Sequence, residues 1–286
     1  MRIAVTGATG RLGRALVAAL GGLGEVRSWS RPEYDLDDPR AAARVIASRP
    51  DLIVHPAAWT DVDGCAREPA LAFRRNGEAV DELARAASAA GIRLVLVSTN
   101  EVFDGNELRR AYKPGDTVGP KNPYGASKLR GEEAAQDAYV GWRDGLLIAR
   151  TAWLYGAPGN DFPMKIVAAA RRAKSSGEPL RLVRDEIGSP SLASDVADGI
   201  RALLADHISG TRHVVNSGRA TRAEWAQLVL DIAGVDVPTE LVPAATWRRE
   251  SDAPAFCVLA SDVALRPWQA ATREYVMTGL PRAALA

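Results

Sequence analysis

Tyr124 and Lys128 lie four residues apart in a segment, residues 122–128, whose side chains could move a proton. If this segment opens a helix, the two side chains share one face, one turn apart. A phenol with an unperturbed pKa of ~10 is a poor proton donor or acceptor at neutral pH, and a neighbouring ammonium would draw that pKa toward the working range. On its own, however, this spacing marks a surface pair more often than a catalytic one.

Hydroxyl-bearing side chains follow the strand predicted over residues 92–97. The chain there continues as Ser98-Thr99-Asn100-Glu101. In a doubly wound parallel sheet, ligands gather beyond the carboxyl ends of the strands. We therefore expect Ser98 and Thr99 to face a ligand site.

The start of the chain predicts the element that positions this chemistry. An apolar strand at residues 2–5 runs into a turn with glycine at every third position, Gly7, Gly10 and Gly13, and residues 15–20 follow as a helix. Glycine lets the backbone approach a pyrophosphate closely, and the free N–H groups of the next helix face its negative charge. Strand, turn and helix together predict a dinucleotide site. The alternative is a glycine-rich turn that only packs the helix on the strand.

The residues after the second predicted strand, 25–29, bear on the choice of cofactor. Where a Rossmann unit that prefers NAD has an acidic residue for the ribose 2′-hydroxyl, this chain has Ser30-Arg31. Arg31 can pair with a 2′-phosphate, and Arg11 in the glycine turn could add a second positive charge. We therefore expect NADPH rather than NADH. If both arginines are solvated surface residues, NADH stays open.

A third buried strand, residues 51–54, runs into His55, Ala57 and Ala58. The two alanines are small enough to let a cofactor lie against the strand end, whereas His55 is expected to be structural. We expect Lys128 to hold the nicotinamide ribose. The whole set expected at the cofactor is Gly7, Thr9, Gly10, Arg11, Leu12, Arg31, Asp35, Leu36, Ala57, Ala58, Trp59, Asn76, Tyr124 and Lys128.

The alternation of strands and helices predicts an α/β protein, a Rossmann-type doubly wound parallel sheet with a smaller C-terminal α/β substrate domain. Residues 1–152 are expected to form the NAD(P)-binding domain and residues 153–286 mainly the substrate domain, with segments near 185–216 returning to the first. Further elements are expected at 69–90, 161–173, 194–205 and 221–233 as helices and at 146–150, 180–183 and 212–216 as strands. Thr221 and Glu224 predict a capping box at the start of the last helix.

Composition excludes several classes of function. Of 286 residues, 47% are hydrophobic and 25% charged, and 36 Lys and Arg against 35 Asp and Glu give a formal net charge of +1. This balance favours neither nucleic acid nor a membrane surface as a partner. The two cysteines, Cys65 and Cys257, have no metal-ligand spacing, and no secretory signal or spanning run is evident. We therefore expect a cytoplasmic protein.

Several motifs resemble those of the extended short-chain dehydrogenase/reductases. They are the glycine turn at 6–13, Ser98-Thr99, and Tyr124 with Lys128. Within that superfamily, residues 50–54, 97–105, 150–156 and 185–191 resemble the dTDP-4-dehydrorhamnose reductase family. The resemblance covers essentially the whole chain. It implies reduction of the 4-keto group of a dTDP-linked 6-deoxy sugar to give dTDP-L-rhamnose.

The resemblance also implies roles for individual residues. Thr99, Tyr124 and Lys128 match the family's catalytic threonine, tyrosine and lysine. Tyr124 would protonate the developing alkoxide, Lys128 would lower the pKa of Tyr124, and Thr99 would hydrogen-bond the carbonyl oxygen. Thr99, Asn100 and Trp153 are expected to contact the sugar. A core position for Trp153 is the alternative.

The chain departs from the family at several positions. The Asp-Tyr usual after the Ser-Thr pair is Asn100-Glu101 here, which is similar to the Asp-Glu acid and base of the nucleotide-sugar 4,6-dehydratases, but Asn100 cannot act as the acid. An Arg-Pro and a Ser-Val-Leu of the family appear as Ala253-Pro254 and Cys257-Val258-Leu259, so a cation that could have balanced phosphate charge is absent there. Ala15 occupies the region of a metal-binding glutamate, and we expect no metal.

Two other classes of function stay open from sequence. One is a regulatory NADP-binding protein without catalysis, since the beta subunit of methionine adenosyltransferase is similar to this family. The other is a reductase or epimerase for a different nucleotide sugar. A homodimer is also compatible with the resemblance.

Overall fold

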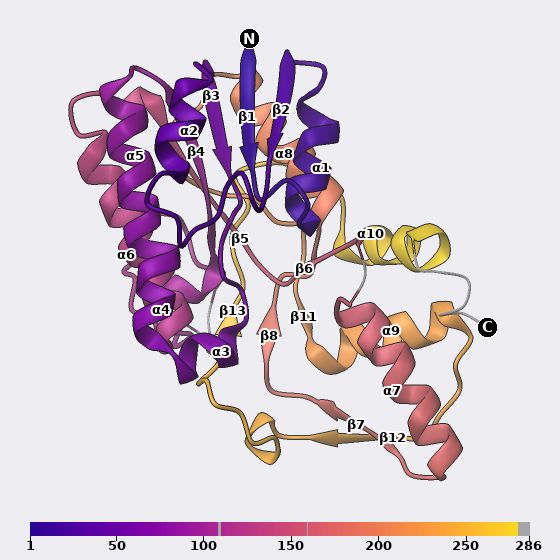
Figure 1. Cartoon of the computed structure of the whole chain (residues 1–286). Coiled ribbons are helices and arrows are strands. Elements are labelled where there is room, and N and C mark those ends of the chain that lie inside the picture. The colour runs from indigo at the N-terminus through magenta and orange to yellow at the C-terminus, as the bar shows by residue number, and fades with distance from the viewer. Residues whose placement is uncertain (108–109, 159, 280–286) are drawn as a thin grey trace.

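A six-stranded parallel sheet forms the centre of the molecule (Figure 1). The computed structural model describes residues 1–107, 110–158 and 160–279. In spatial order the strands are β10 (Gly210–His213), β5 (Leu146–Thr151), β4 (Arg93–Thr99), β3 (Leu52–His55), β1 (Arg2–Thr6) and β2 (Glu25–Trp29). The order reverses at β1, which has β2 on one side and β3 on the other. A crevice for ligands is expected beyond the carboxyl ends at such a reversal. The predicted Rossmann-type sheet is confirmed.

Helices cover both faces of the sheet, which is why its central strands are continuous apolar runs. α1 (Arg11–Leu20) and α8 (Ala193–Ala205) pack together on one face. α2 (Ala41–Ala47), α5 (Ala79–Ala89) and α6 (Pro123–Ala138) cover the other. Each face has its own apolar core.

The helix expected over residues 69–90 is present and contains one irregular turn. α4 (Pro69–Phe73) passes through a π-helical turn at Arg74–Glu78 into α5. π turns are frequent at functional sites. Asn76 lies in this turn, and its side chain bonds the main chain of Trp59 in the loop after β3.

Segments that follow β5 build a second, smaller group of elements beside the carboxyl ends of the sheet (Figure 1). Its main helices are α7 (Phe162–Ser176), α9 (Arg222–Ala233) and α10 (Trp268–Glu274), which share an apolar core that includes Trp225. Small sheets join them: β7 (Leu180–Val183) with β12 (Thr239–Val242), β8 (Ile187–Gly188) between β11 (Ala220–Thr221) and β13 (Phe256–Cys257), and β6 (Leu154–Tyr155) with β9 (Ser191–Leu192). Shorter helices are α3 (Val62–Arg67), 3-10 turns at Asn100–Val102, Arg143–Gly145 and Ala244–Thr246, and a π turn at Tyr275–Gly279.

The elements expected after residue 153 are present, with some shifted ends. The capping box of α9 is confirmed, since Thr221 Oγ1 accepts from Glu224 N at 3.0 Å and Thr221 N donates to Glu224 Oε2 at 2.7 Å. The strand expected at 212–216 is wrong in its end: β10 stops at His213. Beyond the strand, Val214 N still donates to the Arg150 carbonyl of β5 at 2.9 Å, and the side chain of Asn216 accepts from Leu192 N at 2.8 Å.

Arg150 and Glu132 form a buried ion pair between β5 and α6. Arg150 Nη2 lies 2.6 Å from Glu132 Oε2, and the side chains are 5% and 1% exposed. On α6, Tyr124, Lys128 and Glu132 follow one another at intervals of four residues and therefore share a face. The pair holds this face against the sheet.

Replacing Glu132 with Gln should lower the free energy of unfolding by about 3–5 kcal/mol, because the Arg150 guanidinium stays buried without a compensating charge. Chemical denaturation measures this loss. The control is Asp81→Asn in the exposed pair Arg85–Asp81 of α5, which should cost no more than about 0.5 kcal/mol. Equal losses in the two variants would contradict the role of the buried pair.

Candidate active site

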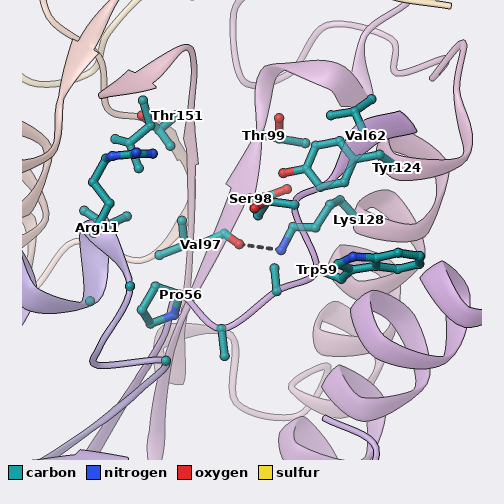
Figure 2. A pocket seen from close by; sticks show the side chains of 18 of the residues that line it. Arg11, Pro56, Trp59, Val62, Val97, Ser98, Thr99, Tyr124, Lys128 and Thr151 are labelled. Carbon is teal, nitrogen blue, oxygen red and sulfur yellow. Dashed lines mark hydrogen bonds between the residues drawn. The ribbon is translucent and has the colours of Figure 1, made fainter. Parts of the chain in front are cut away.

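A cavity of about 750 Å³ opens at the carboxyl ends of β1, β3, β4 and β5. It runs from the glycine turn, past the ends of β3 and β4, to Trp153 and Trp225 in the second group of elements. Figure 2 shows side chains of its wall from the glycine turn, the loop after β3, the end of β4 and the first turns of α6. Every residue expected at the cofactor or the sugar lines it except Asn76.

The backbone of the glycine turn lies so close to neighbouring backbone that a side chain at Gly7 or Gly13 would collide with it. Gly7 has φ +55°, and a Cβ there would lie 2.9 Å from Ala57 Cα. A Cβ on Gly13 would lie 2.1 Å from the Gly7 carbonyl oxygen. No side chain caps α1, whose first turn contains no acidic residue, so its N-terminal N–H groups remain for an anion. The turn therefore fits a pyrophosphate, as expected from its sequence.

Arginines gather at the end of the cavity near β2. Ser30, Arg31, Asp35 and Leu36 line the cavity, and an adjoining hollow of about 550 Å³ is lined by Arg14, Arg27 and Arg31 among others. Sequence reasoning named only Arg31 of these three. The signal available for Arg27 was its alternation with Trp29 on β2, over whose ring its guanidinium lies at 4.3 Å. The hollow suits a second anion.

Arg11 does not take part in this cluster. Its Nε donates to the Gly156 carbonyl at 2.7 Å, and Figure 2 shows it on the side of Thr151. The expectation that Arg11 adds a second positive charge beside Arg31 is therefore wrong for this structure. Its contact partner lies 145 residues away in the chain, so local spacing could not predict the direction of the side chain.

Asn76 acts through the wall of the cavity and does not reach it. It is 1% exposed; its Oδ1 accepts from Trp59 N at 2.8 Å, and its Nδ2 donates to Trp59 O at 3.0 Å and Ser127 Oγ at 3.1 Å. Both polar atoms of the Asn76 side chain are engaged in these bonds, so the side chain is not placed for the expected contact with a cofactor. Asn76 instead fixes Trp59, which does line the cavity, against α6.

His55 is structural, as expected. It is fully buried, and its Nδ1 lies 2.8 Å from the Thr6 hydroxyl. Burial lowers the pKa of His55 to about 3, so the ring is neutral.

Thr99, Tyr124 and Lys128 come together in the middle of the cavity wall. Asn122 caps α6 by accepting from Gly125 N at 2.8 Å, and this brings Tyr124 to the end of β4. Thr99 Oγ1 donates to Asn100 Oδ1 at 3.3 Å, and Figure 2 shows the Thr99 side chain beside the Tyr124 ring. Lys128 Nζ donates to the Val97 carbonyl at 2.8 Å (Figure 2). The predicted cluster of side chains is therefore present.

The electrostatics of this cluster differ from the expectation. Burial raises the pKa of Tyr124, the charge of Glu101 raises it further, and the bond from Thr99 partly opposes both. Burial also lowers the pKa of Lys128 to about 8, against the opposing charge of Glu132. The expected lowering of the Tyr124 pKa by Lys128 is wrong for this structure, because the ammonium bonds Val97. The phenol is thus held protonated, as a proton donor must be.

Trp153 forms the far end of the cavity. It has φ +40°, and the Arg222 guanidinium lies 3.6 Å from the centre of its ring. Arg222 and Arg249 both pair with Glu186. Sequence reasoning missed Arg222 and Lys165, which also line the cavity. They supply positive charge to the cavity wall, whereas Ala253, the position of the family's arginine, is not part of that wall.

Among the described residues, no group of three or more His, Cys, Asp or Glu side chains could hold a metal ion. None of the helices within these residues has the length and apolar character needed to cross a membrane.

The chain is similar to known proteins over nearly its whole length. A family model described as the RmlD substrate binding domain matches residues 1–278. A dTDP-4-dehydrorhamnose reductase of Mycobacterium tuberculosis strain H37Rv is 35% identical over 259 residues, 88% of this chain and 82% of that protein. A dTDP-4-keto-6-deoxy-D-glucose reductase of Streptomyces niveus is 36% identical over 267 residues, 90% of this chain and 88% of that protein.

Solved structures agree with these relatives. A dTDP-4-dehydrorhamnose reductase of Clostridium acetobutylicum superposes with a TM-score of 0.89 at 28% identity, covering 97% of this chain and 99% of that one. The Bacillus anthracis enzyme, solved in complex with NADP, gives a TM-score of 0.86 at 27% identity, covering 96% and 97%. The chain therefore belongs to the dTDP-4-dehydrorhamnose reductase family, in agreement with the resemblance of its motifs.

Proposed function

We propose that the protein reduces the 4-keto group of a nucleotide-linked 6-deoxy sugar with NADPH, and that dTDP-4-dehydro-L-rhamnose is its substrate. The observation that carries this proposal is the placement of Thr99, Tyr124 and Lys128 in one cavity with the glycine turn. The same cavity extends to the aromatic and basic residues around Trp153, which gives room for a sugar nucleotide beside the cofactor. Relatives at 35% and 36% identity are named as reductases of such sugars.

The residues present fit NADPH at each of its charged groups. The glycine turn and the uncapped N-terminus of α1 suit the pyrophosphate, and the hollow with Arg14, Arg27 and Arg31 suits the 2′-phosphate. NADPH supplies the hydride when it is bound. A structure of the B. anthracis relative in complex with NADP supports this choice of cofactor.

The chain's own residues do the proton chemistry. The Thr99 hydroxyl donates a hydrogen bond to the keto oxygen, which stabilises the charge that grows there. Tyr124, kept protonated by burial, then gives its proton to the alkoxide. Lys128, one turn further along α6, holds the nicotinamide ribose and so positions the cofactor beside the phenol. Asn100, at the end of β4, lines the same part of the cavity and contacts the sugar.

Replacing Tyr124 with Phe should lower kcat for dTDP-4-dehydro-L-rhamnose by about 10²–10⁴-fold while leaving the Kd for NADPH within a few-fold, because only the proton donor is removed. NADPH absorbance follows the first quantity and calorimetry the second. The matched control is Tyr139→Phe, at the residue that follows the last turn of α6, which loses only a 2.6 Å bond to the Ile92 carbonyl and should keep full activity. A wild-type protein that binds NADPH yet never oxidises it would contradict the proposal and favour a regulatory role.

The arginine hollow predicts the cofactor preference. Arg31→Ala should reduce the ratio of kcat/KM for NADPH to that for NADH by about tenfold or more, since a charge-assisted bond to the 2′-phosphate is lost. Arg201→Ala, an exposed arginine on α8, serves as control and should leave the ratio unchanged. A ratio that does not respond to Arg31→Ala would place the 2′-phosphate elsewhere.

The pKa of Lys128 predicts a pH dependence of NADPH binding. Burial lowers this pKa to about 8, so the ammonium that holds the ribose is lost from the free protein as the pH rises through that value. The Kd for NADPH should therefore rise above pH 8, by up to about tenfold per pH unit. Fluorescence titration between pH 6.5 and 9.5 should show this rise in the wild type and a flat profile in Lys128→Met. Parallel profiles would show that Lys128 is not the titrating group.

A further inference from the structure

Glu101 lines the cavity close to Thr99 and Tyr124. Its carboxylate has no role in the mechanism above. It lies two residues after Thr99 in the 3-10 turn Asn100–Val102, and Thr99 Oγ1 accepts from Glu101 N at 3.2 Å. The same threonine thus serves the keto oxygen and fixes the backbone of Glu101. Glu101 lines the same cavity as Tyr124, and its charge raises the pKa of that phenol.

One side of the Glu101 carboxylate is fixed by the protein. Asn122 Nδ2 donates to its Oε2 at 2.6 Å. Asn122 is itself immobile, since it caps α6 and also donates to the Asp252 carbonyl at 3.0 Å. Within the described ranges, this is the one hydrogen bond that the carboxylate receives, and no Lys or Arg lies within 4.0 Å of it. A carboxylate offers about four acceptor sites, so most of its capacity is unused.

The charge of Glu101 does not help the reduction. A carboxylate near Tyr124 opposes the growth of negative charge on the keto oxygen. The carboxylate itself is also poorly solvated, and burial raises the pKa of Glu101. Arg222 offsets this charge at longer range, without an ion pair. A buried carboxylate with unused acceptor sites is stabilised when a bound ligand donates a hydrogen bond to it. In a 6-deoxy-4-keto sugar the carbonyl carbon is flanked by C5, which carries the methyl group and the ring oxygen but no hydroxyl, and by C3, which carries a hydroxyl.

We propose that Glu101 accepts a hydrogen bond from the C3 hydroxyl of the keto sugar and so selects sugars that carry a hydroxyl next to the reacting carbonyl. This inference rests on the proposed function, because it assumes that the keto group lies at Thr99 and Tyr124. A site that hydrogen-bonds a substrate hydroxyl rejects the analogue that lacks it, since the buried partner is then left unpaired. Glu101 is thereby a specificity-determining residue that touches the substrate.

The test compares dTDP-4-dehydro-L-rhamnose with its 3-deoxy analogue. The wild type should prefer the hydroxylated compound by about 10- to 100-fold in kcat/KM, as expected for a hydrogen bond to a charged group. Glu101→Leu should reduce this preference to about threefold or less, while Glu101→Gln, which keeps one acceptor oxygen, should retain part of it. Glu133→Leu, at an exposed glutamate of α6, should leave the preference unchanged. A Kd for NADPH equal to that of the wild type shows that each variant is folded.

Binding of the two compounds to the protein saturated with NADP⁺, measured by calorimetry, separates this inference from the proposed function. The same preference should appear in Kd, and it should again be lost in Glu101→Leu, whether or not the protein turns over either compound. A wild type without preference in both assays, or a preference that survives in Glu101→Leu, would overturn the inference. If the wild type binds the hydroxylated sugar more tightly than the 3-deoxy analogue but oxidises no NADPH, the inference about Glu101 is supported and the proposed reduction is wrong.

Discussion

The burial of one polar face of α6 against β4 and β5 is the constraint on which the site depends. Tyr124, Lys128 and Glu132 lie along that face, and each would be costly to bury alone. Each faces a compensating group from the sheet: the Thr99 hydroxyl lowers the pKa of the phenol, the Val97 carbonyl accepts from the lysine, and Arg150 of β5 pairs with the glutamate. These polar contacts therefore fix the orientation of α6 about its axis and its position along the sheet. The side chains of Tyr124 and Lys128 are fixed as a consequence.

The sheet order explains why the glycine turn and Trp153 lie at two ends of one cavity. The reversal at β1 places the glycine turn and the loop after β3 side by side, and the strands from β3 to β5 lead away from them toward Trp153. Later segments complete the far end, since α9 brings Arg222 over the Trp153 ring. Trp153 takes a positive φ, a conformation that non-glycine residues rarely adopt and that surrounding structure must impose. The Trp153 end of the cavity is thus built by parts of the chain that are far apart in sequence.

Local patterns predicted the elements and contacts that arise within a few residues. The glycine turn, the Tyr124–Lys128 spacing and the capping box of α9 are of this kind, and all are present. Features set by distant neighbours could not be predicted. Arg11 turns to Gly156 because a carbonyl from another segment is there, and Asn76 turns inward because a π turn presents it to Trp59. The pKa of Tyr124 rises because its surroundings are buried and acidic, which no spacing between two residues reveals.

Charge at the sugar end is redistributed relative to the expected family pattern. Ala253 stands where the family has an arginine. Arg249 and Arg222 both form ion pairs with Glu186, so these three side chains together carry one net positive charge. Glu101, whose charge Arg222 partly offsets, takes up that excess. Lys165 then remains as a further cation on the cavity wall, and together with the N-terminus of α1 it makes the cavity favourable for phosphate groups. Although the family arginine is replaced by Ala253, the cavity wall therefore keeps cations that a nucleotide diphosphate could contact, Lys165 from α7 and Arg222 from α9.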